Sequence, residues 1–151
     1  MVTKNLSNDF MAKVLEDAAW KELSGDFAWN EQLLEKYRDK VVWKTISGNS
    51  SILWTVSMLE KFKNRIDWEE ISSSNNEHLF TIENLEKYKN YWNWRELSRN
   101  SSLELTPAIL EQFADYWDWS EIIDCYGRDE LYNYNPQNEA FRLFRTNRII
   151  S

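Results

Sequence analysis

Glycine, proline, cysteine and histidine are scarce in this sequence: its 151 residues include three Gly, two Pro, one Cys and one His. Because glycine and proline interrupt helices, their scarcity leaves few breaks between regular elements. The single cysteine, Cys125, excludes an internal disulfide and fits a reducing compartment. Residues 1–19 lack a continuous apolar run and carry Glu16 and Asp17, so we expect no signal peptide, no membrane span and a cytoplasmic protein.

The residue patterns of catalytic and metal sites are also missing. His78 has no cysteine at metal-binding spacing and lies among the Asn and Glu residues of a predicted loop. Cys125 has no histidine near it in the sequence, so we interpret it as a buried structural residue. No glycine-rich phosphate loop occurs. The sequence therefore predicts no enzyme, no metal site and no cofactor.

One short motif, Trp-x-x-[Ile/Leu]-Ser, recurs through the chain. Its copies follow one another at steps of 23, 25, 26 and 25 residues and begin at Trp20, Trp43, Trp68, Trp94 and Trp119. In the last copy Ile123 replaces the serine. A fixed period of this size is the signature of a repeat protein. Because no long run alternates apolar and polar residues, as a strand would, we predict an all-α fold.

Each full repeat is predicted to contain a longer helix and then a short one. The longer helices should begin at the N-cap residues Asn30, Thr55, Thr81 and Thr106, and each carries apolar residues at i, i+3 and i+7. The short helix begins at the repeat Trp, and Asp67, Asn93 or Asp118 can cap it. We predict that the five repeat Trp residues are structural, and that the indole N–H bonds a helix-end carbonyl of the neighbouring repeat. If any Trp is exposed, we expect it to be Trp29 or Trp54, which end loops.

These elements predict a single domain, residues 1–151, folded as a short α-solenoid of four to five helix-pair repeats. Residues 1–19 are predicted to form an N-terminal cap, a shortened repeat whose helix Asn8 would begin. The Trp repeats occupy residues 20–123. Residues 124–151 are predicted to form a C-terminal cap, in which Phe141 and Phe144 cover the last repeat. The three Asn-x-Ser sequons, at Asn5, Asn49 and Asn100, are interpreted as chance products of Asn- and Ser-rich loops.

The Trp-x-x-[Ile/Leu]-Ser copies, with Leu-Glu-Lys-[Phe/Tyr]-Lys between them, resemble short Trp-rich tandem repeats of uncharacterised bacterial and large-DNA-virus proteins. The resemblance covers about residues 20–123. It implies a repeat architecture and no particular activity.

Charge is unevenly distributed along a chain whose formal net charge is -7. A column of Glu35, Glu60, Glu86 and Glu111 follows the repeat Leu, and we interpret it as a solvated face rather than as a pair of glycosidase carboxylates. Residues 100–127 contain six acids and no Lys or Arg. Spacing of i, i+4 and i+7 predicts one exposed acidic face of Glu111, Asp115 and Asp118. The candidate partner-binding residues are Glu111, Asp115, Asp118, Glu121 and Asp124.

Solenoids mostly present surfaces to other macromolecules, so the leading hypothesis is a non-enzymatic protein-binding module. In its sharper form, the chain is an inhibitor or regulator of a basic, nucleic-acid-handling protein, such as a phage-encoded anti-defence protein of the anti-CRISPR type. We expect a monomer that binds neither nucleic acid nor membrane directly, since both are anionic. Two alternatives stay open: a carbohydrate or small-ligand binder that uses loop Trp and Tyr, and a purely structural repeat protein.

Overall fold

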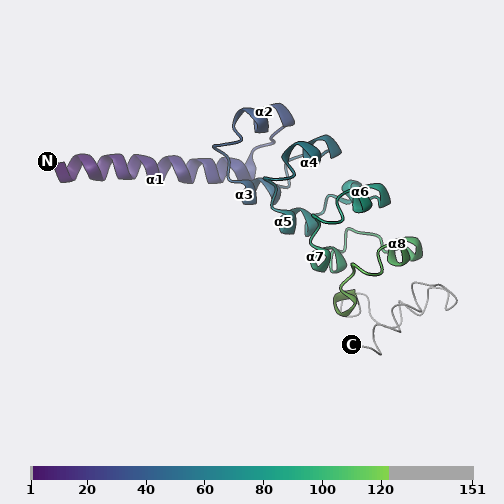
Figure 1. Ribbon diagram of the computed structural model, residues 1–151. Helices are drawn as coiled ribbons and strands as arrows, with labels where there is room; N and C mark the ends of the chain where they lie inside the picture. The colour runs from purple at the N-terminus through teal and green to yellow at the C-terminus, as the bar shows by residue number, and fades with distance from the viewer. Residues whose placement is uncertain (1, 123–151) are drawn as a thin grey trace. The chain divides into compact units, whose positions relative to one another are not determined.

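The computed structural model describes the backbone of residues 2–122 and the side chains of residues 8–122. Within that range every regular element is helical (Figure 1). The long-helix positions hold α2 (Glu31–Lys36), α4 (Val56–Phe62), α6 (Ile82–Lys87) and α8 (Pro107–Gln112). The short-helix positions hold α3 (Trp43–Ser47), α5 (Trp68–Ser72) and α7 (Trp94–Ser98). The remaining elements are α1 (Val2–Asp26) and a 3-10 turn, η1 (Glu77–Leu79). The predicted fold class, an all-α repeat solenoid, is confirmed.

The chain divides into two compact units, Met1–Glu70 and Ile71–Ser151, and the division falls inside α5. Both units contain the same alternation of long-helix and short-helix positions. The predicted C-terminal cap, residues 124–151, lies outside the described residues, as do Ile123, Asp124 and Cys125.

Local sequence signals set the starts of the helices as predicted. A side-chain oxygen accepts a hydrogen bond from the backbone N–H three residues later at Asn30, Thr55, Thr81 and Thr106. The same bond forms before the short helices at Asp67, Asn93 and Asp118. Val42 has no such oxygen, and α3 begins without a side-chain cap. Each cap satisfies one of the N–H groups that the first turn of a helix leaves unpaired.

The long-position helices are shorter than their apolar pattern indicated. In the last repeat α8 ends at Gln112, although the predicted stripe runs through Phe113 to Trp117. One further turn follows, in which the N–H of Trp117 donates to the carbonyl of Phe113 at 3.3 Å. That turn keeps Leu110, Phe113 and Trp117 buried, at 4%, 1% and 5% exposure. The pattern therefore predicted burial correctly but overestimated helix length.

The expected start of the first helix at Asn8 was wrong. Asn8 does not begin a helix but lies inside α1, which runs without a break from Val2 to Asp26 and includes the first Trp motif. The reason is compositional: Ala12, Leu15, Ala18 and their neighbours are strong helix formers, and Gly25 is the first breaker in this segment. Without a breaker, the predicted cap and the first short helix merge into one helix.

Every repeat Trp is half-buried in the described residues. The rings of Trp20, Trp43 and Trp94 pack against the next long-helix position, on Tyr37, Phe62 and Phe113, at 5.1–5.5 Å between ring centroids. In the four copies from Trp43 to Trp119, the indole N–H donates to a carbonyl of the same repeat, not of the neighbouring one as predicted. The 2.8–3.0 Å bonds run from Trp43 to Arg38, Trp68 to Lys63, Trp94 to Lys89 and Trp119 to Ala114. Each of these four Trp residues thus closes the turn between the longer helix and the short helical segment of its own repeat.

The two tryptophans named as the likeliest exceptions to burial lie in the core. Trp29 is 5% exposed and Trp54 is fully buried. Trp29 donates its indole N–H to the carbonyl of Leu23 at 3.0 Å and packs edge-on against Phe27. A loop can end in a buried aromatic residue when its backbone polar groups are bonded elsewhere.

The motif serine joins successive repeats, and sequence reasoning had given it no role. Ser98 is fully buried, donates its hydroxyl to the carbonyl of Trp94 and accepts the N–H of Asp118, the cap of the next short helix, at 2.9 Å. In the same way, the serine hydroxyl oxygen accepts a backbone N–H in three other places: Ser24 from Val42, Ser47 from Asp67 and Ser72 from Asn93. Each short helix is therefore hydrogen-bonded to the start of the next one.

Two buried asparagines add a second connection between repeats. The amide of Asn49 donates to the carbonyls of Ser24 and Phe27, and that of Asn100 to the carbonyls of Ser72 and Ser74, at 2.7–2.8 Å. Both asparagines begin sequons, but their amide groups are committed to the fold. This agrees with the interpretation of these sequons as chance matches.

Candidate interaction surface

Two of the five candidate acids are exposed. Glu111 lies near the end of α8, and Asp115 lies in the turn after it. The predicted arrangement of Glu111, Asp115 and Asp118 on one helical face is wrong, because α8 ends at Gln112. The two exposed carboxylates belong to a helix end and the turn that follows it.

Two other candidates are committed to the fold. Asp118 caps the next helical turn by accepting the N–H of Glu121 at 3.2 Å, and its own N–H donates to Ser98. The carboxylate of Glu121, whose side chain is 19% exposed, accepts a hydrogen bond from Arg95 at 3.1 Å. The fifth candidate, Asp124, lies outside the described residues. Of the five candidate acids, Glu111 and Asp115 are therefore the two that the structure shows as exposed.

The glutamate column is a series of surface ion pairs rather than a merely solvated face. Each pair joins a glutamate to a base three residues later: Glu35 to Arg38 (3.0 Å), Glu60 to Lys63 (3.2 Å) and Glu86 to Lys89 (2.9 Å). The hydrogen bond from Lys89 lowers the pKa of Glu86, and the same bond raises the pKa of Lys89.

Glu111 departs from this series. Three residues after it stands Ala114, which offers no charge, and no ion pair of Glu111 occurs within residues 8–122. A base that bridges between repeats is also lost from α8: Lys61 approaches Glu35 of the preceding repeat at 3.9 Å, and Gln112 occupies the matching position in α8, so this change affects the surroundings of Glu86. Among the described residues, the ion pair that earlier repeats form between the repeat Glu and the base three residues later is therefore missing at Glu111.

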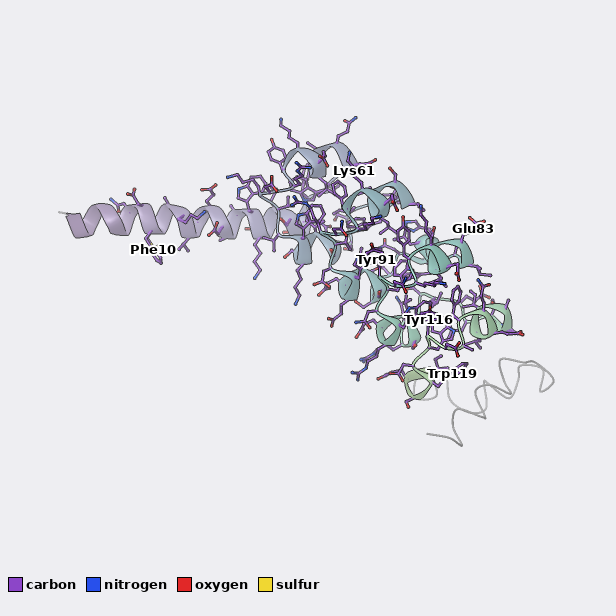
Figure 2. The ribbon with its side chains drawn as sticks, in the orientation of Figure 1. Phe10, Lys61, Glu83, Tyr91, Tyr116 and Trp119 are labelled. Atoms are coloured by element: carbon purple, nitrogen blue, oxygen red, sulfur yellow. The ribbon has the colours of Figure 1, made fainter. Side chains whose placement is uncertain are left out.

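Two exposed tyrosines lie in the same unit, and the sequence analysis missed them. Tyr91 and Tyr116 are each 38% exposed and follow the long-position helices α6 and α8 (Figure 2). Aligning the repeats on their Trp residues would have revealed them, because the same position holds Lys40 and Arg65 in the two preceding repeats. The ring of Tyr116 packs at 5.1 Å from that of Trp94, which fixes its orientation. We call Glu111, Asp115, Tyr91 and Tyr116 the acidic–aromatic surface.

Hollows also occur elsewhere on the described surface. In the second unit, an open hollow of about 360 Å³ includes Glu77, Glu104 and the exposed His78 of η1 in its lining. In the first unit, a groove of about 290 Å³ is lined mainly by aromatic and aliphatic side chains, including Trp20, Phe27 and Tyr37. Among the described residues, no three His, Cys, Asp or Glu side chains are grouped so that they could hold a metal ion.

In the part of the chain that the structure describes, no helix is both long enough and apolar enough to cross a membrane. No family model, curated protein or solved structure matches the chain. The function is therefore inferred from the surface residues themselves.

Proposed function

We propose that this chain is a non-enzymatic protein-binding module, and that its acidic–aromatic surface binds a basic surface on another protein. The observation that carries the proposal is the loss of the base that pairs with the repeat Glu: Ala114 stands three residues after Glu111, where earlier repeats hold Arg38, Lys63 and Lys89. Packing does not require this loss, because Leu110 and Phe113 already supply the buried side of the repeat. Like charges left without partners favour a cationic ligand.

The tyrosines extend the proposal from charge to contact area. Tyr is enriched in the centres of protein interfaces, since it offers a large, rigid apolar face and a hydroxyl. Arginine and lysine also stack on aromatic rings. Tyr116 beside Asp115 thus offers a basic side chain both an aromatic face and a carboxylate. By contrast, ligand binding through loop tryptophans is less well supported, because Trp29 and Trp54 are buried.

The partner class that fits best is a protein that handles nucleic acid. Its basic surface is shaped to receive phosphates, and a surface rich in carboxylates competes for the same Lys and Arg side chains. The chain would then act as an inhibitor or regulator, for example as a phage-encoded anti-defence protein in the cytoplasm. The net charge of -7 suits that role, since it speeds the approach to a cationic target.

A capture experiment with matched charge variants tests the proposal. The parent should retain a basic protein at low salt and release it as salt shortens the screening length from about 10 Å at 0.1 M to about 3 Å at 1 M. Adding DNA or RNA should displace the captured protein. Glu111→Lys combined with Asp115→Lys should abolish capture with little effect on folding, because exposed substitutions usually change stability by no more than about 0.5 kcal/mol.

The control is Glu69→Lys combined with Glu83→Lys. This variant changes the net charge by the same amount at exposed positions outside the acidic–aromatic surface. It should still capture the partner. Equal loss in both variants would mean that net charge, not this surface, governs binding. Equal capture by the parent and the Glu111/Asp115 variant would exclude the surface altogether.

A further inference from the structure

The apolar groove of the first unit lies where the first repeat lacks a longer helix. Each later short helix follows a longer helix and a turn, whereas the first Trp motif belongs to α1, which runs unbroken from Val2 to Asp26 (Figure 1). The groove is lined from the end of α1 through α2, and we call it the α1–α2 groove. Its lining residues are Trp20, Leu23, Phe27, Trp29, Leu33 and Tyr37.

The side chains of this groove are less buried than their equivalents in the later repeats. Leu23 is 43% exposed. Its equivalents, three residues after each later repeat Trp, are fully buried: Ile46, Ile71, Leu97 and Ile122. Leu33 is half-buried, while Met58 and Ile109 at the matching position are 3% and 7% exposed. Tyr37 is also half-buried, and its equivalents are 1–2% exposed: Phe62, Tyr88 and Phe113.

The next repeat shows which element covers these positions. There α2 lies along α4, which carries Met58 and Phe62. The hydroxyl of Ser57 in α4 donates to the carboxylate of Glu31 in α2 at 2.8 Å. The longer helix of one repeat therefore covers the longer helix of the next. Because α1 continues straight instead of forming such a helix, the matching side of α2 stays open as the α1–α2 groove.

The charge at the edge of the groove indicates what an added helix would carry. Lys61 of α4 approaches Glu35 of α2 at 3.9 Å, and the position of Lys61 is held in α2 by Lys36. The ammonium of Lys36 lies over the ring of Tyr37, 5.3 Å from its centroid, and Lys36 forms no ion pair within the described side chains. A carboxylate at the Glu35 position of an added helix would therefore meet Lys36.

We propose that the α1–α2 groove binds an amphipathic helix of a partner protein, in the place that the longer helix of a preceding repeat would take. That helix presents apolar residues at i, i+3 and i+7, as the longer helices of this chain do, and a carboxylate directly after the first of them. The groove shares no residue with the acidic–aromatic surface, so the inference does not depend on the proposed function.

The occupant is a partner rather than a second copy, because the longer helices of this chain are already packed in their own repeats. The repeat leucines of α2, α4, α6 and α8 are 0–4% exposed: Leu34, Leu59, Leu85 and Leu110. Within the described residues, none of these helices could enter the groove of another copy without leaving its own repeat.

A peptide that copies the covering helix tests the proposal. The probe is a stapled helical peptide with the sequence of residues 30–42, since a short free helix is only marginally stable in water. Added to the full chain, it should shift the indole N–H signals of Trp20 and Trp29 in NMR spectra in a saturable way. Leu23→Glu should weaken binding about tenfold or more, because it places a charge in the groove.

The matched control is Leu53→Glu, which makes the same change at a 75% exposed position of the first unit outside the groove, and it should bind like the parent. Circular dichroism checks that both variants stay folded. The charge contact is tested separately: Lys36→Glu, at an exposed position, should weaken binding, and Glu35→Lys in the peptide should restore it. If Leu23→Glu loses its helical signal, this charge exchange decides alone.

Three results would overturn the proposal. The first is a parent whose Trp signals do not respond to the peptide, and the second is equal binding by the parent and a folded Leu23→Glu variant. The third is a parent that sediments as a dimer, when Leu23→Glu is a monomer and Leu53→Glu a dimer, since a second copy would then fill the groove. Failure of the charge exchange to restore binding would overturn the contact between Lys36 and the added helix.

Discussion

Replacing Ser98 with alanine isolates the contribution of the serine that joins two repeats. The hydroxyl of Ser98 is fully buried and accepts the N–H of Asp118 at 2.9 Å, while it donates to the carbonyl of Trp94 at 2.6 Å. Alanine removes both bonds and leaves little space, since only one oxygen is lost. The carbonyl of Trp94 still accepts a backbone hydrogen bond within α7. The main group left without a hydrogen-bond partner is therefore the N–H of Asp118.

The expected cost follows from that orphaned donor. An unsatisfied buried polar group costs about 1–3 kcal/mol, and the N–H of Asp118 is only partly buried, so we expect about 1–2 kcal/mol. For a chain of this size, each kcal/mol lowers Tm by about 2–4 °C. The loss should fall on the contact between adjacent repeats, because stability in repeat proteins depends on nearest-neighbour interfaces.

Urea unfolding followed by Trp fluorescence should give the free-energy change, and hydrogen exchange should locate it. The amide of Asp118 should exchange faster by about tenfold for each 1.4 kcal/mol lost. Ser101→Ala, at an exposed position in the next loop, is the control and should melt like the parent. If Ser98→Ala also melts like the parent and the Asp118 amide keeps its protection, the serine does not hold the repeats together.

Further substitutions and conditions test other contacts. Trp94→Ala should cost about 3–5 kcal/mol, the range for large aromatic truncations, since its ring contacts Phe113 and Trp117; unchanged thermal melting would show that these ring contacts are dispensable. Asn100→Ala should destabilise by about 1–3 kcal/mol because it leaves two carbonyls without their donor, which chemical denaturation will measure. The pKa of Glu86 is lowered from 4.5 by Lys89, so their pair should stabilise the fold slightly above that pH and lose its effect as pH falls through the lowered pKa. The stability difference between parent and Lys89→Met should therefore vanish in acid, and a constant difference would contradict the pairing. A glycan array should give no hits.

Local signals could be predicted from the sequence, whereas longer-range pairings could not. The caps at Thr55, Thr81 and Asn93 depend on a side chain and an N–H three residues away, and they formed as expected. The Ser98 bond joins groups 20 residues apart. The repetition of the serine was visible, but nothing in one repeat indicated which backbone group of the next repeat it would meet.

The errors in the candidate site have a related physical cause. Asp118 was predicted both to cap a helix and to bind a partner, although a carboxylate engaged with the first turn is already committed. Glu121 could not be excluded from sequence, because its partner Arg95 lies 26 residues earlier. Trp54 was named as a likely exception to burial because it ends a loop, but its side chain is fully buried. In each case tertiary contacts decided the outcome.

Equivalent positions in successive repeats differ in how much their residue types vary, and the acidic–aromatic surface includes positions that vary. Positions that hold the fold together keep the same kind of residue. Leu85 and Leu110 occupy the same position in successive longer helices, Leu97 lies in a short helix, and all three are 0–4% exposed. The position of Tyr116 is different, since the preceding repeats hold Lys, Arg and Tyr there, residues of unlike charge and shape. A surface position with such variation is not fixed by packing, because the repeats stack regardless of its identity. Ala114 and Tyr116, which follow Glu111, are therefore local changes that the packing of the solenoid does not require, and the partner binding that we propose for this surface would account for both.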